Sequence, residues 1–173
     1  MKRSYWPVLA VALVFSAAGA WFGARQFQPA PAAPNALEQF YARTMPDASG
    51  AATPMAQWKG RPLVLNFWAT WCAPCVEEMP ELTALQQEIQ AKNVQILGIG
   101  IDNPASISAF AEKYKISYPL YVAGMEGSEL SRQLGNQAGG LPFTVLVDAS
   151  GKVRKTYLGR LKMEELRRDI NAL

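Results

Sequence analysis

Residues 66–76 read NFWATWCAPCV and contain the only two cysteines of the 173-residue chain, Cys72 and Cys75. The run that enters this stretch, LVLNFWA at 63–69, is almost wholly apolar and rich in β-branched and aromatic side chains, which predicts a buried strand. The stretch TWCAPC then leads into a predicted helix, with Pro74 in the first turn, where the missing N–H costs nothing. The sequence therefore predicts both thiols at a strand-to-helix turn.

Outward from this turn, predicted strands alternate with predicted helices. Further extended segments are expected at 94–101, 118–122, 143–148 and 153–158, the last two as a β-hairpin. Helices are expected from the cysteines to about 91, at 104–115, at 128–134 with Ser128 as N-cap, and at 162–172. Pro80 should kink the first helix. This order predicts an α/β domain with a mixed central sheet flanked by helices.

The composition excludes several classes of protein. Two cysteines are too few for a disulfide-stapled scaffold, and the chain contains no histidine, the commonest metal ligand and general base. Three basic residues before residue 26 account for the whole formal net charge of +3, so residues 26–173 carry no net basic charge. We therefore expect no nucleic-acid partner, no cofactor and no bound metal.

The N-terminal segment carries an export signal of one of two kinds. Residues 4–24 lack charged side chains, follow Lys2 and Arg3, and are long enough for a membrane span of about twenty residues. Ala18-Gly19-Ala20 also fits a cleavage site of a secretory signal. We expect a membrane anchor or signal sequence at 1–25, a Pro/Ala-rich linker at 26–36 and one domain at 37–173.

A CxxC pair has several chemical uses. Haem attachment requires a histidine after the second cysteine, where this chain has Val76, and a zinc site commonly needs four ligands. Copper(I) binding by two thiolates remains an alternative. Redox exchange fits best, because a helix N-terminus stabilises the thiolate of Cys72. Cys75 shares a helix face with Met79 and should be more buried, so Cys72 would attack and Cys75 would resolve.

Two motifs resemble one known family. VLNFWATWCAPCVEEMP at 64–80 and GGLPFTVLVDASG at 139–151 are similar to the TlpA/ResA-type thiol–disulfide oxidoreductases of the thioredoxin superfamily. The resemblance spans roughly 37–173 and implies a thioredoxin-like fold with Cys72 and Cys75 as its redox disulfide. It also implies a cis-proline at Pro142, after Leu141, that faces the cysteines.

The resemblance and the spacing both single out Glu78. Thioredoxins carry a buried aspartate beneath the cysteines, where this chain has Asn66, whereas TlpA/ResA-like proteins have a glutamate three residues after the second cysteine. Glu78 occupies that position, one turn beyond Cys75 on the same inward face. A half-buried carboxylate there should have a raised pKa and accept the proton of Cys75. Glu77, Glu81 and Glu88 are expected on the solvated surface.

The side chains around the cysteines should shape the site. Trp68 is expected in the core, and Trp71 is expected beside the reactive sulfur as an apolar docking surface. The dipeptide Ala73-Pro74 between the cysteines has no histidine to stabilise a thiolate strongly, which argues against a very oxidising potential.

We therefore expect an exported enzyme on the periplasmic side of the bacterial inner membrane, anchored or secreted. The resemblance implies that it reduces disulfides of client proteins, such as apocytochromes or cuproprotein assembly factors, and that a transmembrane thiol electron donor restores its dithiol. Two alternatives remain open, namely an oxidase that donates disulfides and a copper-binding module that keeps the fold without electron transfer.

Overall fold

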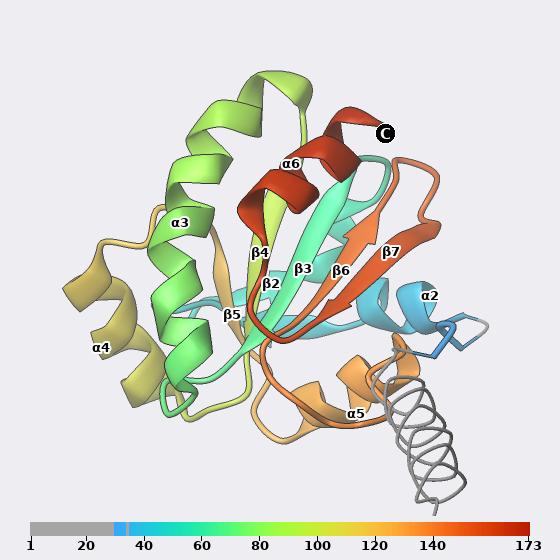
Figure 1. Cartoon of the computed structure of the whole chain (residues 1–173). Helices are drawn as coiled ribbons and strands as arrows, with labels where there is room; N and C mark the ends of the chain where they lie inside the picture. Colours follow the sequence, from blue (N-terminus) through green and yellow to red (C-terminus); the bar gives the residue numbers. More distant parts are fainter. Residues whose placement is uncertain (1–29, 34) are drawn as a thin grey trace, which may run out of the picture.

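The computed structural model describes residues 30–33 and 35–173 (Figure 1). Within these ranges no helix combines the length and the apolar character needed to cross a bilayer. The expected anchor or signal at 1–25 lies outside the described residues, and so does much of the linker at 26–36.

A five-stranded mixed sheet forms the centre of the domain, in the order β5-β4-β3-β6-β7. The pairs β3–β4 and β4–β5 are parallel, whereas β3–β6 and β6–β7 are antiparallel. This confirms the predicted mixed sheet and the hairpin. The strand bounds are β3 Leu63–Trp68, β4 Gln95–Gly100, β5 Leu120–Val122, β6 Phe143–Val147 and β7 Val153–Leu158.

Helices cover both faces of this sheet (Figure 1). One face packs against α3, α4 and α6, and the other packs against α2 and α5. Because side chains of a strand alternate between faces, β3 feeds both cores: Val64 and Trp68 point to the first, and Leu63, Leu65 and Phe67 point to the second. A strand buried on both faces reads as an unbroken apolar run. The helix bounds are α2 Ala36–Tyr41, α3 Ala73–Ile89, α4 Pro104–Tyr114, α5 Glu126–Gln133 and α6 Met163–Asn171.

The elements that precede β3 were not predicted from the sequence. A two-stranded antiparallel hairpin, β1 Thr44–Pro46 with β2 Ala52–Pro54, follows α2, and a 3₁₀ helix at Met55–Trp58 follows it. Strands of three residues are too short to show a period of two. In the turn, the Asp47 carboxylate accepts hydrogen bonds from the Ser49 and Ala51 backbone N–H groups.

Two local details differ from, or go beyond, the expectation. Ser128 is not an N-cap: α5 begins two residues earlier, at Glu126, and its N-cap position is Met125, which makes no side-chain cap. The acidic side chains Glu126 and Glu129 in the first turn are favourable next to the positive end of the helix instead. Pro80 lies inside α3, which continues to Ile89, and the kink there stays a prediction.

Candidate functional site

Cys72 and Cys75 are joined by a disulfide at the start of α3. Cys72 is the N-cap residue, with the extended backbone that this position requires (φ −91°, ψ 99°), and Pro74 lies in the first helical turn as expected. Cys72 is 6% exposed, whereas Cys75 is completely buried. The predicted asymmetry between an outer and an inner sulfur is therefore present.

The two tryptophans before the disulfide have opposite environments. Trp68 ends β3 with no exposed surface and packs against Phe110 of α4, with ring centroids 4.8 Å apart. Trp71 immediately precedes Cys72 and is 69% exposed. Its indole therefore presents apolar area to solvent next to the disulfide. Both placements agree with the sequence analysis.

Glu78 lies one turn beyond Cys75 and is completely buried, which exceeds the half-burial expected from the sequence. One carboxylate oxygen accepts a hydrogen bond from Asn66 Nδ2 at 2.8 Å, and the other accepts one from the Leu161 backbone N–H at 2.9 Å. Burial raises the pKa of Glu78 to about 7, and the two hydrogen bonds oppose that rise by stabilising the anion. A carboxyl with this pKa exchanges its proton near neutrality.

The buried amide beneath Glu78 belongs to β3. Asn66 Nδ2 also donates to Thr144 Oγ1 at 3.0 Å, because the two residues are directly paired in the β3–β6 register. Asn66 Oδ1 is buried and has no hydrogen-bond partner among the described residues. Thr144 and Leu161 were not predicted as site residues, since no local sequence pattern marks Thr144 as a partner of Asn66 or Leu161 as a partner of Glu78.

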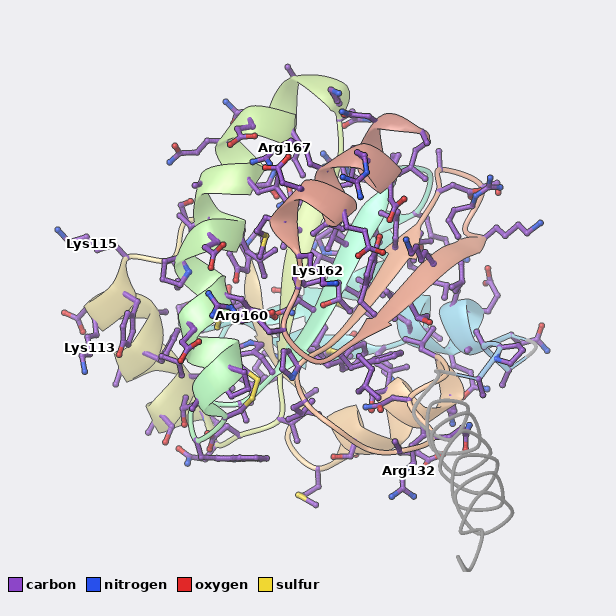
Figure 2. The ribbon with its side chains drawn as sticks, in the orientation of Figure 1. Lys113, Lys115, Arg132, Arg160, Lys162 and Arg167 are labelled. Atoms are coloured by element: carbon purple, nitrogen blue, oxygen red, sulfur yellow. A yellow bond between two sulfur atoms is a disulfide. The ribbon has the colours of Figure 1, made fainter. Side chains whose placement is uncertain are left out.

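The acidic residues on either side of Glu78 are exposed, as expected, but they are also paired. Arg160, from the loop between β7 and α6, contacts Glu77 Oε2 through Nη1 and Glu81 Oε1 through Nη2, each at 2.8 Å. Figure 2 shows Arg160 between α3 and the start of α6. Further along α3, Glu88 Oε2 pairs with Nε of Arg167, from α6, at 3.0 Å.

The Leu141–Pro142 peptide bond is cis, as the resemblance implied. It precedes β6, and because Phe67 pairs with Phe143 in the antiparallel register, it lies beside the end of β3 that leads to Cys72. The residue before this bond, Gly140, is fixed by a buried side chain. Asn136, which is 1% exposed, donates from Nδ2 to the Gly140 carbonyl oxygen at 2.9 Å.

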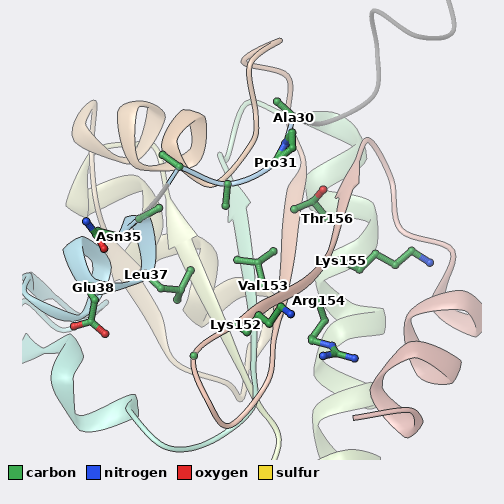
Figure 3. Close-up of a pocket in the computed structure, with 14 residues that line it drawn as sticks. Ala30, Pro31, Asn35, Leu37, Glu38, Lys152, Val153, Arg154, Lys155 and Thr156 are labelled. Carbon is green, nitrogen blue, oxygen red and sulfur yellow. The ribbon is translucent and has the colours of Figure 1, made fainter.

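An open groove of about 370 Å³ lies near the turn that carries the cysteines. It is lined by residues that include Thr70, Val76 and Phe110. A larger cavity, of about 520 Å³, lies between residues 30–33, the start of α2 and β7, and no site residue lines it (Figure 3). Neither of these two spaces is lined by Cys72 or Cys75.

Comparisons with known proteins agree with this geometry. Residues 28–172 match the family model described as Redoxin. The thiol-disulfide oxidoreductase ResA of Geobacillus thermodenitrificans is 30% identical over 128 residues, which cover 73% of this chain and 71% of that protein. ResA of Halalkalibacterium halodurans is 26% identical over 159 residues, which cover 91% and 88%.

A solved structure shows the same fold. It is that of a secreted Mycobacterium tuberculosis disulfide oxidoreductase described as homologous to DsbE of E. coli, with a TM-score of 0.65 and 23% identity. The match covers 79% of this chain and 99% of that one. The chain therefore belongs to the Redoxin family and is a thioredoxin-like, ResA-like thiol–disulfide oxidoreductase whose CxxC pair is Cys72–Cys75.

Proposed function

We propose that this oxidoreductase reduces disulfide bonds of exported client proteins, with Cys72 as the nucleophile and Cys75 as the resolving thiol. The observation that carries the proposal is the buried Glu78 carboxyl, with a pKa of about 7, one helical turn from Cys75. A proton acceptor one turn from Cys75 would assist the resolving step, in which Cys75 releases the reduced client.

In the first step, the Cys72 thiolate attacks one sulfur of the client disulfide. A mixed disulfide forms, and the other client sulfur leaves as a thiolate that takes a proton from water. The position of Cys72 at the N-cap supports this role, because the positive end of the α3 dipole favours the thiolate. The exposed indole of Trp71 contributes apolar contact to the docked client.

In the second step, the Cys75 thiol transfers its proton to the Glu78 carboxylate and attacks Cys72 Sγ. The bond between Cys72 and the client breaks, the second client sulfur leaves as a thiolate that takes a proton from water, and the Cys72–Cys75 disulfide remains. Two electrons have then passed from the enzyme to the client. A membrane-bound dithiol, the expected electron donor, would return them by the reverse exchange.

The client backbone is proposed to lie along the residues before β6. Pro142 has no N–H, so the neighbouring Leu141 offers its backbone groups to an extended segment beside the cysteines. Asn136 supports this edge by bonding the Gly140 carbonyl immediately before it.

Asn136→Ala should weaken the recognition of protein clients more than the thiol chemistry. The substitution leaves the partly buried Gly140 carbonyl without its partner and loosens the approach to Leu141. We expect a free energy of unfolding lower by about 1–3 kcal/mol. KM for a disulfide-containing polypeptide should rise several-fold while the rate with a small disulfide stays unchanged. An equal change with both substrates would contradict the docking role.

We also propose that this activity lies outside the cytoplasm, on the basis of the N-terminal sequence. The uncharged run at 4–24 favours a membrane anchor with the domain on the periplasmic side, or secretion if the segment is cleaved. The solved Mycobacterium tuberculosis relative is itself described as secreted. Clients with exposed disulfides in that compartment, including apocytochromes and cuproprotein assembly factors, are the class we propose.

The reduction potential tests the direction of transfer. Equilibration of the purified domain with glutathione or dithiothreitol buffers should give a value well below about −220 mV, as expected for a reductant. A value near about −120 mV would identify a disulfide-donating oxidase instead. Tight stoichiometric binding of copper(I) by the reduced protein, without disulfide reductase activity, would assign it to the copper-binding class.

A further inference from the structure

The loop between β7 and α6 is hydrogen-bonded to two parts of the proposed site, the cis-proline and the buried carboxyl. The Gly159 N–H donates to the Pro142 carbonyl oxygen at 2.8 Å, next to the cis peptide bond. Two residues later, the Leu161 N–H donates to Glu78 Oε2 at 2.9 Å. Between them stands Arg160, which the reaction scheme above does not use. The loop therefore links the proposed client-binding residues at Leu141–Pro142 to the buried carboxyl of Glu78.

Arg160 holds this loop against α3 through two acids at once. Its two terminal nitrogens contact Glu77 and Glu81, each at 2.8 Å. These acids are four residues apart, so they lie on one helix face and flank Glu78 in the sequence. A guanidinium can bridge two carboxylates because its donors are held in a rigid planar fork, whereas an ammonium is a single point charge.

We propose that Arg160 is a positioning residue for the resolving step: it fastens the β7–α6 loop over Glu78, so that the Leu161 N–H stays bonded to the carboxylate that accepts the Cys75 proton. This inference rests on the proposed role of Glu78 and adds the residue that keeps Glu78 in its working environment.

The charges around Glu78 give the sign of the effect. Burial raises the pKa of Glu78 most, the Leu161 and Asn66 hydrogen bonds and the Arg160 charge lower it, and Glu81 raises it. The Glu78 charge also acts on Tyr118, whose pKa is raised strongly by burial, so that it stays neutral. Thr144, which accepts a hydrogen bond from Asn66, is uncharged.

Removal of Arg160 takes away the positive charge, leaves Glu77 and Glu81 without their partner, and frees the loop that carries the Leu161 N–H. Each change disfavours the Glu78 anion. The pKa of Glu78 should therefore rise, and the resolving step should need a higher pH.

Arg160→Gln tests this directly, with Arg167→Gln as the matched control. Arg167, on α6, also joins the C-terminal segment to α3, through Glu88, and it is also partly exposed. Its partner Glu88 lies further along α3 from the cysteines than Glu77 and Glu81 do. The first measurement is the rate of client release from the mixed disulfide in a single turnover, followed from pH 5 to pH 9. The second is hydrogen exchange of the Leu161 amide by NMR.

We expect Arg160→Gln to move the acid limb of the pH profile up by about half a unit, which slows release about threefold on that limb. The Leu161 amide should also exchange faster. Arg167→Gln should match the wild type in both measurements. Arg160→Lys, which keeps a charge but cannot bridge two acids with a planar fork, should fall between the two.

The possible outcomes separate this inference from the proposed function. An unchanged acid limb and unchanged Leu161 exchange in Arg160→Gln would overturn the role of Arg160, provided that Glu78→Gln does change the profile. If Glu78→Gln leaves the profile unchanged as well, the proposed role of Glu78 is the one that fails. Should Arg160→Gln not fold, the same two measurements on Arg160→Lys decide, and wild-type behaviour there would overturn the inference.

Discussion

Replacement of Cys75 by serine should stop turnover and leave Cys72 covalently attached to its client. In the wild type, the second thiol is held three residues away in the same helical turn, and Cys72 is the more exposed of the two. Intramolecular attack of this kind has an effective concentration far above that of any free thiol, so loss of Cys75 should slow release at least about a thousandfold. The adduct is measured by non-reducing gel electrophoresis and mass spectrometry of protein from exporting cells.

The matched control is Cys72→Ser, which keeps the inner thiol and loses the outer one. This variant should form no adduct, because Cys75 is completely buried. Dithiothreitol should release the client from the Cys75→Ser adduct. If both variants trap the same proteins equally, or if neither traps any, the assignment of an attacking and a resolving cysteine is wrong.

Glu78→Gln should remove a large pH dependence from the stability of the domain. The pKa of Glu78 is about 7 in the folded protein, against about 4.5 for the unfolded chain. Between these values the folded state holds a proton that the unfolded state has lost. The free energy of unfolding contributed by Glu78 is therefore fully present below about pH 4.5 and is lost as the pH rises through about 7, by up to about 3 kcal/mol.

The measurement is urea unfolding of the oxidised protein between pH 4 and pH 9. Wild-type protein should lose stability across this range relative to Glu78→Gln, whose neutral side chain cannot titrate. Glu88→Gln is the control, since Glu88 lies on the same helix but its carboxyl is exposed and paired with Arg167. Parallel curves for wild type and Glu78→Gln would show that the carboxyl does not titrate in the buried environment.

The same substitution should slow the release of client from Cys72, because the Cys75 thiol loses its proton acceptor. The variant should nevertheless fold. Its amide oxygen can still accept from the Leu161 N–H, and its amide nitrogen can donate to Asn66 Oδ1, which has no partner among the described residues. A rotation of the Asn66 amide brings that oxygen toward position 78.

Local sequence determined the central part of the fold. The strand before the cysteines, the helix after them and the hairpin at 143–158 follow from apolar periodicity, a proline in a first turn and turn residues, all of which act over a few positions. The hairpin of β1 and β2 was missed because three-residue strands carry too little of any pattern. The start of α5 was misplaced because acidic residues in the first turn can open a helix without a side-chain cap.

The proposed site likewise has a part that local sequence determined and a part that only tertiary packing determined. Sequence by itself placed Cys72 at a helix N-terminus and Glu78 one turn beyond Cys75, since both relations are fixed by spacing along one helix. Only the tertiary structure brought Asn66 and Leu161 to that carboxyl, and Arg160 to the acids on either side of it, across separations of 12 to 83 residues. Those contacts depend on strand register and on the packing of the β7–α6 loop against α3. Long-range packing of this kind cannot be predicted from a local sequence pattern.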